Sequence, residues 1–333
     1  EEEGEDNFTR FVSAIGDKTR PFVLDGGQAT QMEREGVDLS GHLWSARLLC
    51  DNPAMIKKTH VAFFLAGADV VVSASYQGTV EGFKRAGMSE EEGKRLLRFS
   101  IQLIKEARNE AWEQMVKDGS SAGRIKPFAG ASVGCYAASL ADGSEYTGSS
   151  YGITPEELRG FHLERLKLFA EEAPDVFAFE TIPNMMEVEA IIDVLNDPQI
   201  LATNIPAWIS VCCKDDETLS SDESVEEFAK FVASRVPSTR LLVSVGVNCV
   251  HPRHVEKILS TMRAYCDLPL VVYPNKGEKF DTARREWVPG TAMDDEDFCK
   301  LSDSWRANGA TMIGGCCRTS VDTIRLLRER LMR

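Results

Sequence analysis

Short apolar runs alternate with longer segments of helical periodicity along most of the chain. Continuous apolar runs are typical of parallel strands that are buried on both faces. The predicted strands cover residues 22–24, 68–75, 127–133, 176–179, 207–212, 241–247, 268–272 and 310–313. Eight alternating units predict an α/β fold, a single (β/α)8 TIM-type barrel. A doubly wound open sheet is the alternative, although no Gly-x-Gly-x-x-Gly follows the first strand.

Helix signals fill the segments between these strands. Apolar residues recur at helical spacing over residues 53–66 and stop at Gly67, and capping boxes begin at Ser89 and Thr154. Residues 137–153, rich in Gly, Ser and Tyr, are expected to form a long loop over one end of the fold. Residues 1–20 are interpreted as an acidic lead-in with a short helix, and residues 21–333 as the barrel domain.

Composition narrows the classes of protein to consider. The chain has 333 residues and a net charge of −14, which argues against nucleic acid or an anionic membrane as the main partner. No apolar stretch approaches the length of a membrane span, and residues 1–7 hold no apolar signal region. Nine cysteines without the spacing of a secreted disulfide framework favour a reducing compartment. We therefore expect a cytoplasmic protein that acts on small molecules.

Three cysteines lie where strands are predicted to end. The run that ends in Gly314 and Gly315 continues with Cys316 and Cys317 ahead of a helical pattern, and a second apolar run ends at Cys249. Glycines permit a sharp turn, and a helix N-terminus favours thiolates. Three thiolates with an open fourth position predict a catalytic Zn²⁺ site. The alternative is that all three are buried apolar cysteines, as expected for Cys212 and Cys213.

Polar residues also gather at the predicted strand ends, where barrel enzymes carry their active sites. Glu180 directly follows an apolar strand, so its carboxylate needs a partner. This carboxylate either binds an amino group, or it is a solvated loop acid or part of a structural salt bridge. Asp25 precedes two glycines and either caps a turn or belongs to the site. Tyr76 and Asn248 also stand at strand ends.

Several of these stretches together resemble the homocysteine S-methyltransferases that use S-methylmethionine or S-adenosylmethionine. The matching motifs run in family order across nearly the whole chain, at residues 24–30, 43–46, 74–78, 179–183, 246–249, 273–275 and 314–317. The resemblance implies a (β/α)8 barrel that methylates homocysteine to methionine. Thr181 stands where betaine-using relatives carry Tyr, and Lys276 where relatives often carry Ser. The first departure argues against betaine as the methyl donor.

The same resemblance implies a role for each site residue. Zinc would be held by Cys249, Cys316 and Cys317, with the sulfur of homocysteine as its fourth ligand. Glu180 would take the ammonium group, and Asp25 with Gly26 would help hold the amino acid. Tyr76 and Asn248 complete the expected substrate site. Apart from the resemblance, an aromatic ring attracts a cation, so Tyr76, Trp44 or Trp287 either faces the sulfonium cation or is a packing residue. Transfer would be direct and in line, with no protein nucleophile.

Other functions remain open at this stage. The same site would also suit selenocysteine or another thiol as the methyl acceptor. A non-catalytic barrel that uses its cysteines for zinc or for sensing oxidants is a rival from a different class, but it needs neither Glu180 nor an amino-acid pocket. The chain lacks the long C-terminal arm of betaine-using relatives, which by analogy leads us to expect a monomer.

Overall fold

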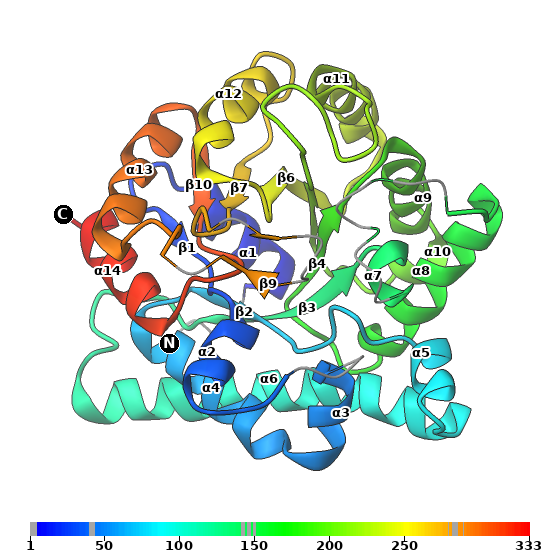
Figure 1. Cartoon of the computed structure of the whole chain (residues 1–333), viewed down its shortest axis with the longest axis horizontal. Coiled ribbons are helices and arrows are strands. Elements are labelled where there is room, and N and C mark those ends of the chain that lie inside the picture. The colour runs from blue at the N-terminus through cyan, green and yellow to red at the C-terminus, as the bar shows by residue number, and fades with distance from the viewer. Residues whose placement is uncertain are drawn as a thin grey trace.

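Eight parallel strands form the wall of a barrel with helices around it (Figure 1). The computed structural model describes residues 5–39, 44–140, 144, 148, 151–278, 280–281, 286–288 and 290–333. The strands are neighbours in the order β1-β10-β7-β6-β5-β4-β3-β2, and a bridge between Leu24 and Val70 joins the two ends of this sheet. The barrel is therefore closed, and the predicted TIM-type fold is confirmed.

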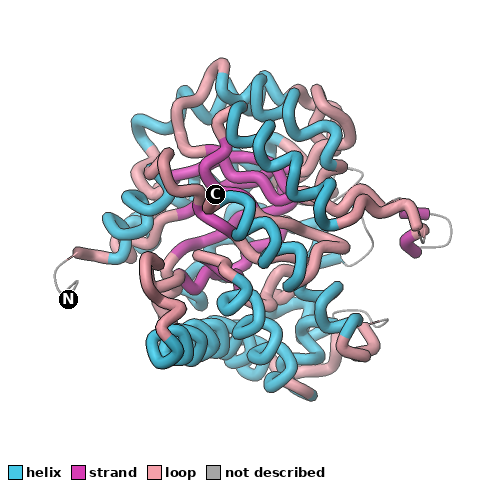
Figure 2. The backbone as a smooth tube through the Cα atoms, turned by 90° about the vertical axis from the view of Figure 1, so that its left-hand side faces the viewer, coloured by secondary structure: helices cyan, strands magenta, loops and turns pink. Residues whose placement is uncertain are grey.

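Each barrel strand lies on its predicted apolar run, but the strand predicted over residues 68–75 is much shorter and covers only Val70–Val72. The strands are β1 Phe22–Val23, β2 Val70–Val72, β3 Phe128–Gly134, β4 Val176–Ile182, β5 Ala207–Val211, β6 Leu242–Asn248, β7 Leu270–Tyr273 and β10 Ala310–Ile313. A separate antiparallel pair, β8 Phe280–Asp281 and β9 Glu286–Trp287, stands away from the barrel (Figure 2).

Most of the helices lie outside the strands, and α1 lies across one end of the barrel. They are α1 Asn7–Gly16, α2 Gln28–Arg34, α3 Trp44–Asp51, α4 Pro53–Ala66, α5 Val80–Arg85, α6 Glu90–Asp118, α7 Tyr136–Leu140, α8 Pro155–Ala170, α9 Met185–Leu195, α10 Pro198–Leu201, α11 Val225–Arg235, α12 Pro252–Arg263, α13 Asp295–Ala307 and α14 Val321–Leu331, with a 3₁₀ turn η2 at Val236–Ser238. None of the helices in the described part of the chain has the length and apolar character needed to cross a membrane.

Local signals explain most helix ends. Gly67 ends α4 in the left-handed conformation, with φ 117°, and Thr154 with Glu157 forms the predicted capping box at the start of α8. Two further expectations were wrong. The segment expected as a loop from residue 137 lies partly in α7, and its residues 141–143, 145–147 and 149–150 lie outside the described part. Strand β4 does not stop at Phe179, because the ladder with β3 continues to Glu180 and that with β5 resumes at Ile182.

The first helix closes the barrel at the end opposite the expected site. Phe11 and Ile15 of α1 are fully buried. The ring of Phe11 lies 5.0 Å from that of Phe128 and 6.4 Å from that of Trp208, both near the starts of their strands. In Figure 1, α1 is seen through the middle of the barrel. The apolar face of α1 therefore completes the core at this end of the barrel.

Candidate active site and metal centre

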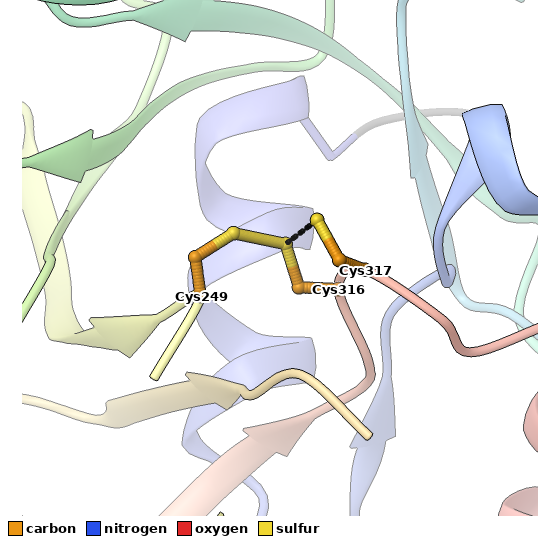
Figure 3. A group of neighbouring side chains, drawn as sticks. All are labelled: Cys249, Cys316 and Cys317. Carbon is orange, nitrogen blue, oxygen red and sulfur yellow. Dashed lines mark hydrogen bonds between the residues drawn. A yellow bond between two sulfur atoms is a disulfide. The ribbon is translucent and has the colours of Figure 1, made fainter. Parts of the chain in front are cut away.

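The three predicted cysteines meet at the carboxyl ends of β6 and β10 (Figure 3). The sulfur atoms of Cys249, Cys316 and Cys317 all lie within 4.8 Å of one another. Cys249 and Cys316 are joined by a disulfide with Cα atoms 5.6 Å apart, and the Sγ atoms of Cys316 and Cys317 are 4.0 Å apart. The structure therefore brings together the three cysteines that the sequence singled out.

Backbone hydrogen bonds place these cysteines. The N–H of Cys249 donates to the carbonyl of Tyr273 at 3.2 Å, and the N–H of Cys316 donates to that of Pro274 at 2.9 Å. Both loops are thus tied to the end of β7. A Cβ on Gly315 would lie 2.5 Å from Oγ1 of Thr319, so the turn before the cysteines leaves no room for a side chain.

The donor set fits zinc when the protein is reduced. Three thiolates from two loops, close enough to share one ion, match a zinc site that keeps a position for substrate. Oδ1 of Asn275 is a buried oxygen without a hydrogen bond from any described residue. The backbone N–H of Asn275 donates to the carbonyl of Val250, and the N–H of Lys276 donates to the carbonyl of Cys317. Asn275 therefore belongs to the loops that carry the cysteines. A disulfide removes two of the thiolates, so oxidation and zinc binding exclude each other.

Two buried carboxylates lie in the same cavity as the cysteines. Asp25 accepts hydrogen bonds from the backbone N–H of Val72 at 3.1 Å and from Nε2 of Gln28 at 3.2 Å. Glu180 accepts from the hydroxyl of Ser132 and is hydrogen-bonded to Tyr273. Strands β2, β3 and β7 therefore help to fix both acids from the surrounding wall.

Among the described residues, no cationic side chain neutralises these carboxylates. Within the described part of the chain, no lysine, arginine or histidine forms an ion pair with Asp25 or Glu180. Burial raises the pKa of Asp25 to about 8, and the charge of Glu180 adds to the increase. Burial also raises the pKa of Glu180 to about 7, although hydrogen bonds from Ser132 and Tyr273 oppose it. A cationic group of a bound ligand would stabilise the ionised form of both acids and so lower both pKa values.

All eight predicted site residues line one cavity of about 170 Å³. They are Asp25, Gly26, Tyr76, Glu180, Asn248, Cys249, Cys316 and Cys317. The ring of Tyr76 packs over Gly134, where a Cβ would lie 2.7 Å from a ring carbon. The side chains of Trp44 and Trp287, the other aromatic candidates for the donor, lie outside the described residues.

Sequence reasoning missed some residues that line the same cavity. Ser132 lines the cavity but lies inside the apolar run of β3. The only signal in the sequence was its place near the end of a predicted strand. Gln28 and Gln77 fall within the matching motifs, which was the available signal. Lys276, the departure from the family pattern, forms an ion pair with Asp295 at 2.8 Å. Its charge is therefore paired with α13 and does not act on the carboxylates.

Known proteins are similar to this chain over most of its length. The family model described as homocysteine S-methyltransferase matches residues 22–331. Homocysteine S-methyltransferase 2 of Arabidopsis thaliana is 42% identical over 316 residues, which cover 93% of this chain and 92% of the relative. A selenocysteine methyltransferase of Astragalus bisulcatus is 39% identical over 326 residues, covering 95% of this chain and 93% of that protein.

A solved structure is also similar over almost its whole length. The homocysteine methyltransferase MmuM from Escherichia coli, in its metallated form, is 33% identical with a TM-score of 0.80, covering 96% of this chain and 99% of that one. Its oxidized form is 32% identical with a TM-score of 0.82, covering 98% of this chain and 100% of that one.

Proposed function

Because this chain belongs to the homocysteine S-methyltransferase family, we propose that it methylates the thiol of homocysteine to give methionine, with zinc held by Cys249, Cys316 and Cys317. The chain is a methyltransferase enzyme. The proposed donor is a sulfonium compound, S-methylmethionine or S-adenosylmethionine. Three cysteine sulfurs and two carboxylates in one cavity are what an amino acid with a thiol side chain requires.

The observation that carries the proposal is a pair of buried acids that form no ion pair with any residue the structure describes. Asp25 and Glu180 are only 6% and 8% exposed, and each has a raised pKa. A bound ammonium group would favour ionised carboxylates and replace the water that burial removes. A zinc store or an oxidant sensor has no need of this pair. An amino-acid substrate therefore accounts for groups that the metal alone leaves unexplained.

In the proposed reaction, the protein binds homocysteine and the methyl donor and holds them in position for transfer. When bound, zinc supplies a Lewis acid that ionises a thiol, whose ordinary pKa is about 8.5, at neutral pH. Glu180 and Asp25 hold the ammonium end of the substrate, so the sulfur end is directed toward the cysteines. The new C–S bond forms as the methyl group leaves the sulfonium sulfur, which keeps the electron pair. The thiol proton passes to solvent. Holding both reactants in line supplies much of the rate.

The direct test is methionine formation by the reduced protein. Homocysteine would be offered with S-methylmethionine, S-adenosylmethionine or betaine, each with and without a zinc chelator. We expect product with a sulfonium donor, loss of that product with the chelator, and none with betaine. Failure of every donor with a protein shown to contain zinc would contradict the proposal.

Selenocysteine is a second candidate acceptor. A relative at 39% identity is named selenocysteine methyltransferase. The carbon chain of selenocysteine is one methylene shorter than that of homocysteine, so its selenium would reach the metal only if the ammonium moved toward the cysteines. The two acceptors should then compete for one site. Equal catalytic efficiency would indicate a carboxylate site that tolerates both positions.

We also propose that the protein works in a reducing compartment such as the cytoplasm. The support is chemical, because a zinc site made of three thiolates requires that Cys249 and Cys316 be reduced.

A further inference from the structure

Two residues at the site have a backbone conformation that their side chains disfavour. Thr181 has φ 61° and Cys249 has φ 49°, both in the left-handed region. This region is unusual for residues other than glycine, and most unusual for a β-branched residue such as threonine. Thr181 directly follows Glu180, and Cys249 is a predicted metal ligand. The strained conformations therefore stand next to the two ends of the proposed amino-acid site.

The side chain of Asn248 holds Thr181 in this conformation. Its Oδ1 accepts the backbone N–H of Thr181 at 2.7 Å, and its Nδ2 donates to Oγ1 of the same residue at 2.8 Å. A backbone N–H can only donate, so the orientation of the amide is fixed. The ladder between β4 and β5 is irregular between Phe179 and Ile182, and the asparagine bonds the N–H of Thr181 within this irregularity.

Two hydroxyl groups also lie between the same asparagine and Glu180. The hydroxyl of Ser210 donates to Oδ1 of Asn248 at 2.7 Å and lies 2.5 Å from the hydroxyl of Tyr273. Trp208 fixes this tyrosine by donating its Nε1–H to the tyrosine oxygen at 3.1 Å. Tyr273 has one hydroxyl proton, so it donates either to Ser210 or to Glu180, and these side chains do not form an unbroken chain of hydrogen bonds. The link from Asn248 to Glu180 therefore runs through the backbone of Thr181.

We propose that Asn248 is a positioning residue that sets where the carboxylate of Glu180 lies relative to the metal-ligating sulfur of Cys249. It is the last residue of β6 and directly precedes that cysteine. One side chain thereby links the ammonium-binding acid to the metal site and fixes the length of amino acid that spans them. The inference rests on the proposed function, because it assigns Glu180 to the ammonium group.

The printed contacts of Asn248 favour this role over direct substrate binding. Both acceptor positions of Oδ1 and one N–H of Nδ2 are used by Thr181 and Ser210. The side chain is also only 1% exposed although it lines the cavity. The first consequence of its removal should be relaxation of Thr181 toward an extended conformation, which would turn Glu180 away from its present position.

The experiment is a double-mutant cycle on the reduced, zinc-loaded protein. The variants are Asn248→Ala, Thr181→Gly and the double variant, with Ser244→Ala as the control. Ser244 lies on the same strand, is fully buried and donates one hydrogen bond to Pro269, so it matches the loss of a buried polar contact away from the site. The measured quantities are the Kd of homocysteine by calorimetry without donor, the donor KM and the zinc content.

We expect Asn248→Ala to raise the Kd of homocysteine about tenfold, with one zinc retained and the donor KM within about twofold. When Thr181 is already replaced by glycine, Asn248→Ala should raise the Kd of homocysteine less than about threefold. The reason is that glycine adopts the left-handed conformation without strain, so it does not need the asparagine to hold it. Ser244→Ala should leave the Kd unchanged.

Equal tenfold losses in both backgrounds would overturn the inference, since they would indicate direct contact with substrate. Loss of zinc from Asn248→Ala, with unchanged affinity in the zinc-loaded fraction, would overturn it as well. Wild-type protein that binds homocysteine without forming methionine would contradict only the proposed function. Wild-type protein that does not bind homocysteine would contradict both.

Discussion

At the scale of single residues, the carboxylates of the cavity make substrate binding depend on pH. The pKa of Glu180 is raised to about 7, so this acid is largely protonated at pH 6 and largely ionised at pH 8. An ammonium group needs the ionised form. Lowering the pH from 8 to 6 should therefore raise the KM of homocysteine by about tenfold from this group alone, and Asp25, with a pKa of about 8, acts in the same direction.

The variant Glu180→Gln checks this prediction. The amide cannot ionise, and loss of a buried charge partner should raise the KM of homocysteine at pH 8 by about thirtyfold or more, or about 2 kcal/mol. Its KM should change less between pH 8 and pH 6 than that of the wild type. Ionisation of the substrate thiol affects both proteins alike, so the difference between the two profiles isolates Glu180. Parallel profiles would contradict the assigned role.

The residues that sequence reasoning found share a simple signal. Cys249, Cys316 and Glu180 stand at or near the end of an apolar run, and parallel strands bring such ends together. Ser132 gave a weaker signal, because a serine inside a strand looks like any small residue until its neighbour across the sheet is known. The bonds of Asn248 to Thr181 were also hidden, since they join strand ends 67 residues apart.

At the scale of elements, close contact between strands constrains the barrel near the metal site. A Cβ on Gly246 of β6 would lie 1.7 Å from the carbonyl oxygen of Val271 on β7. The variant Gly246→Ala should therefore lose about 1–3 kcal/mol of unfolding free energy or more, as measured by urea unfolding. It should also weaken zinc binding, because Cys249 directly follows the last residue of the same strand.

Another glycine-to-alanine change provides the control. A Cβ on Gly160, inside α8, meets nothing within 4 Å. The variant Gly160→Ala should be neutral or stabilise the protein by about 0.5–1 kcal/mol, because alanine favours the helix. A similar loss of stability in both variants would mean that the contact between β6 and β7 is not the cause.

The same scale shows why some element boundaries were mispredicted. Strand β4 continues through Glu180 and Thr181, two polar residues that the pattern placed after the strand, because backbone pairing with β3 does not depend on apolar side chains. The five-residue helix α7 was missed within a segment of small and polar residues. Regular apolar segments such as α4 were predicted to the residue.

At the scale of the whole molecule, the packed core and the polar site residues lie at opposite ends of the barrel. The rings around Phe11 fill the end covered by α1, and the polar groups collect at the other end. The order of strands, one after another around the barrel, follows from eight repeated units, so the sequence alone predicted it. The oxidation state of the cysteines could not be predicted, because the same three sulfurs serve either as a disulfide or as metal ligands.

The central claim is that the three cysteines form a zinc site at which homocysteine is methylated. The most direct measurement is zinc content together with methionine formation from homocysteine and S-methylmethionine, on oxidised and fully reduced protein. Reduced wild type should hold one zinc per chain and form methionine, and oxidised wild type should do neither. Cys317→Ser should lose both, while Cys50→Ser, at an exposed cysteine, should keep both. Methionine formed at the wild-type rate by Cys317→Ser, or by protein free of zinc, would contradict the account.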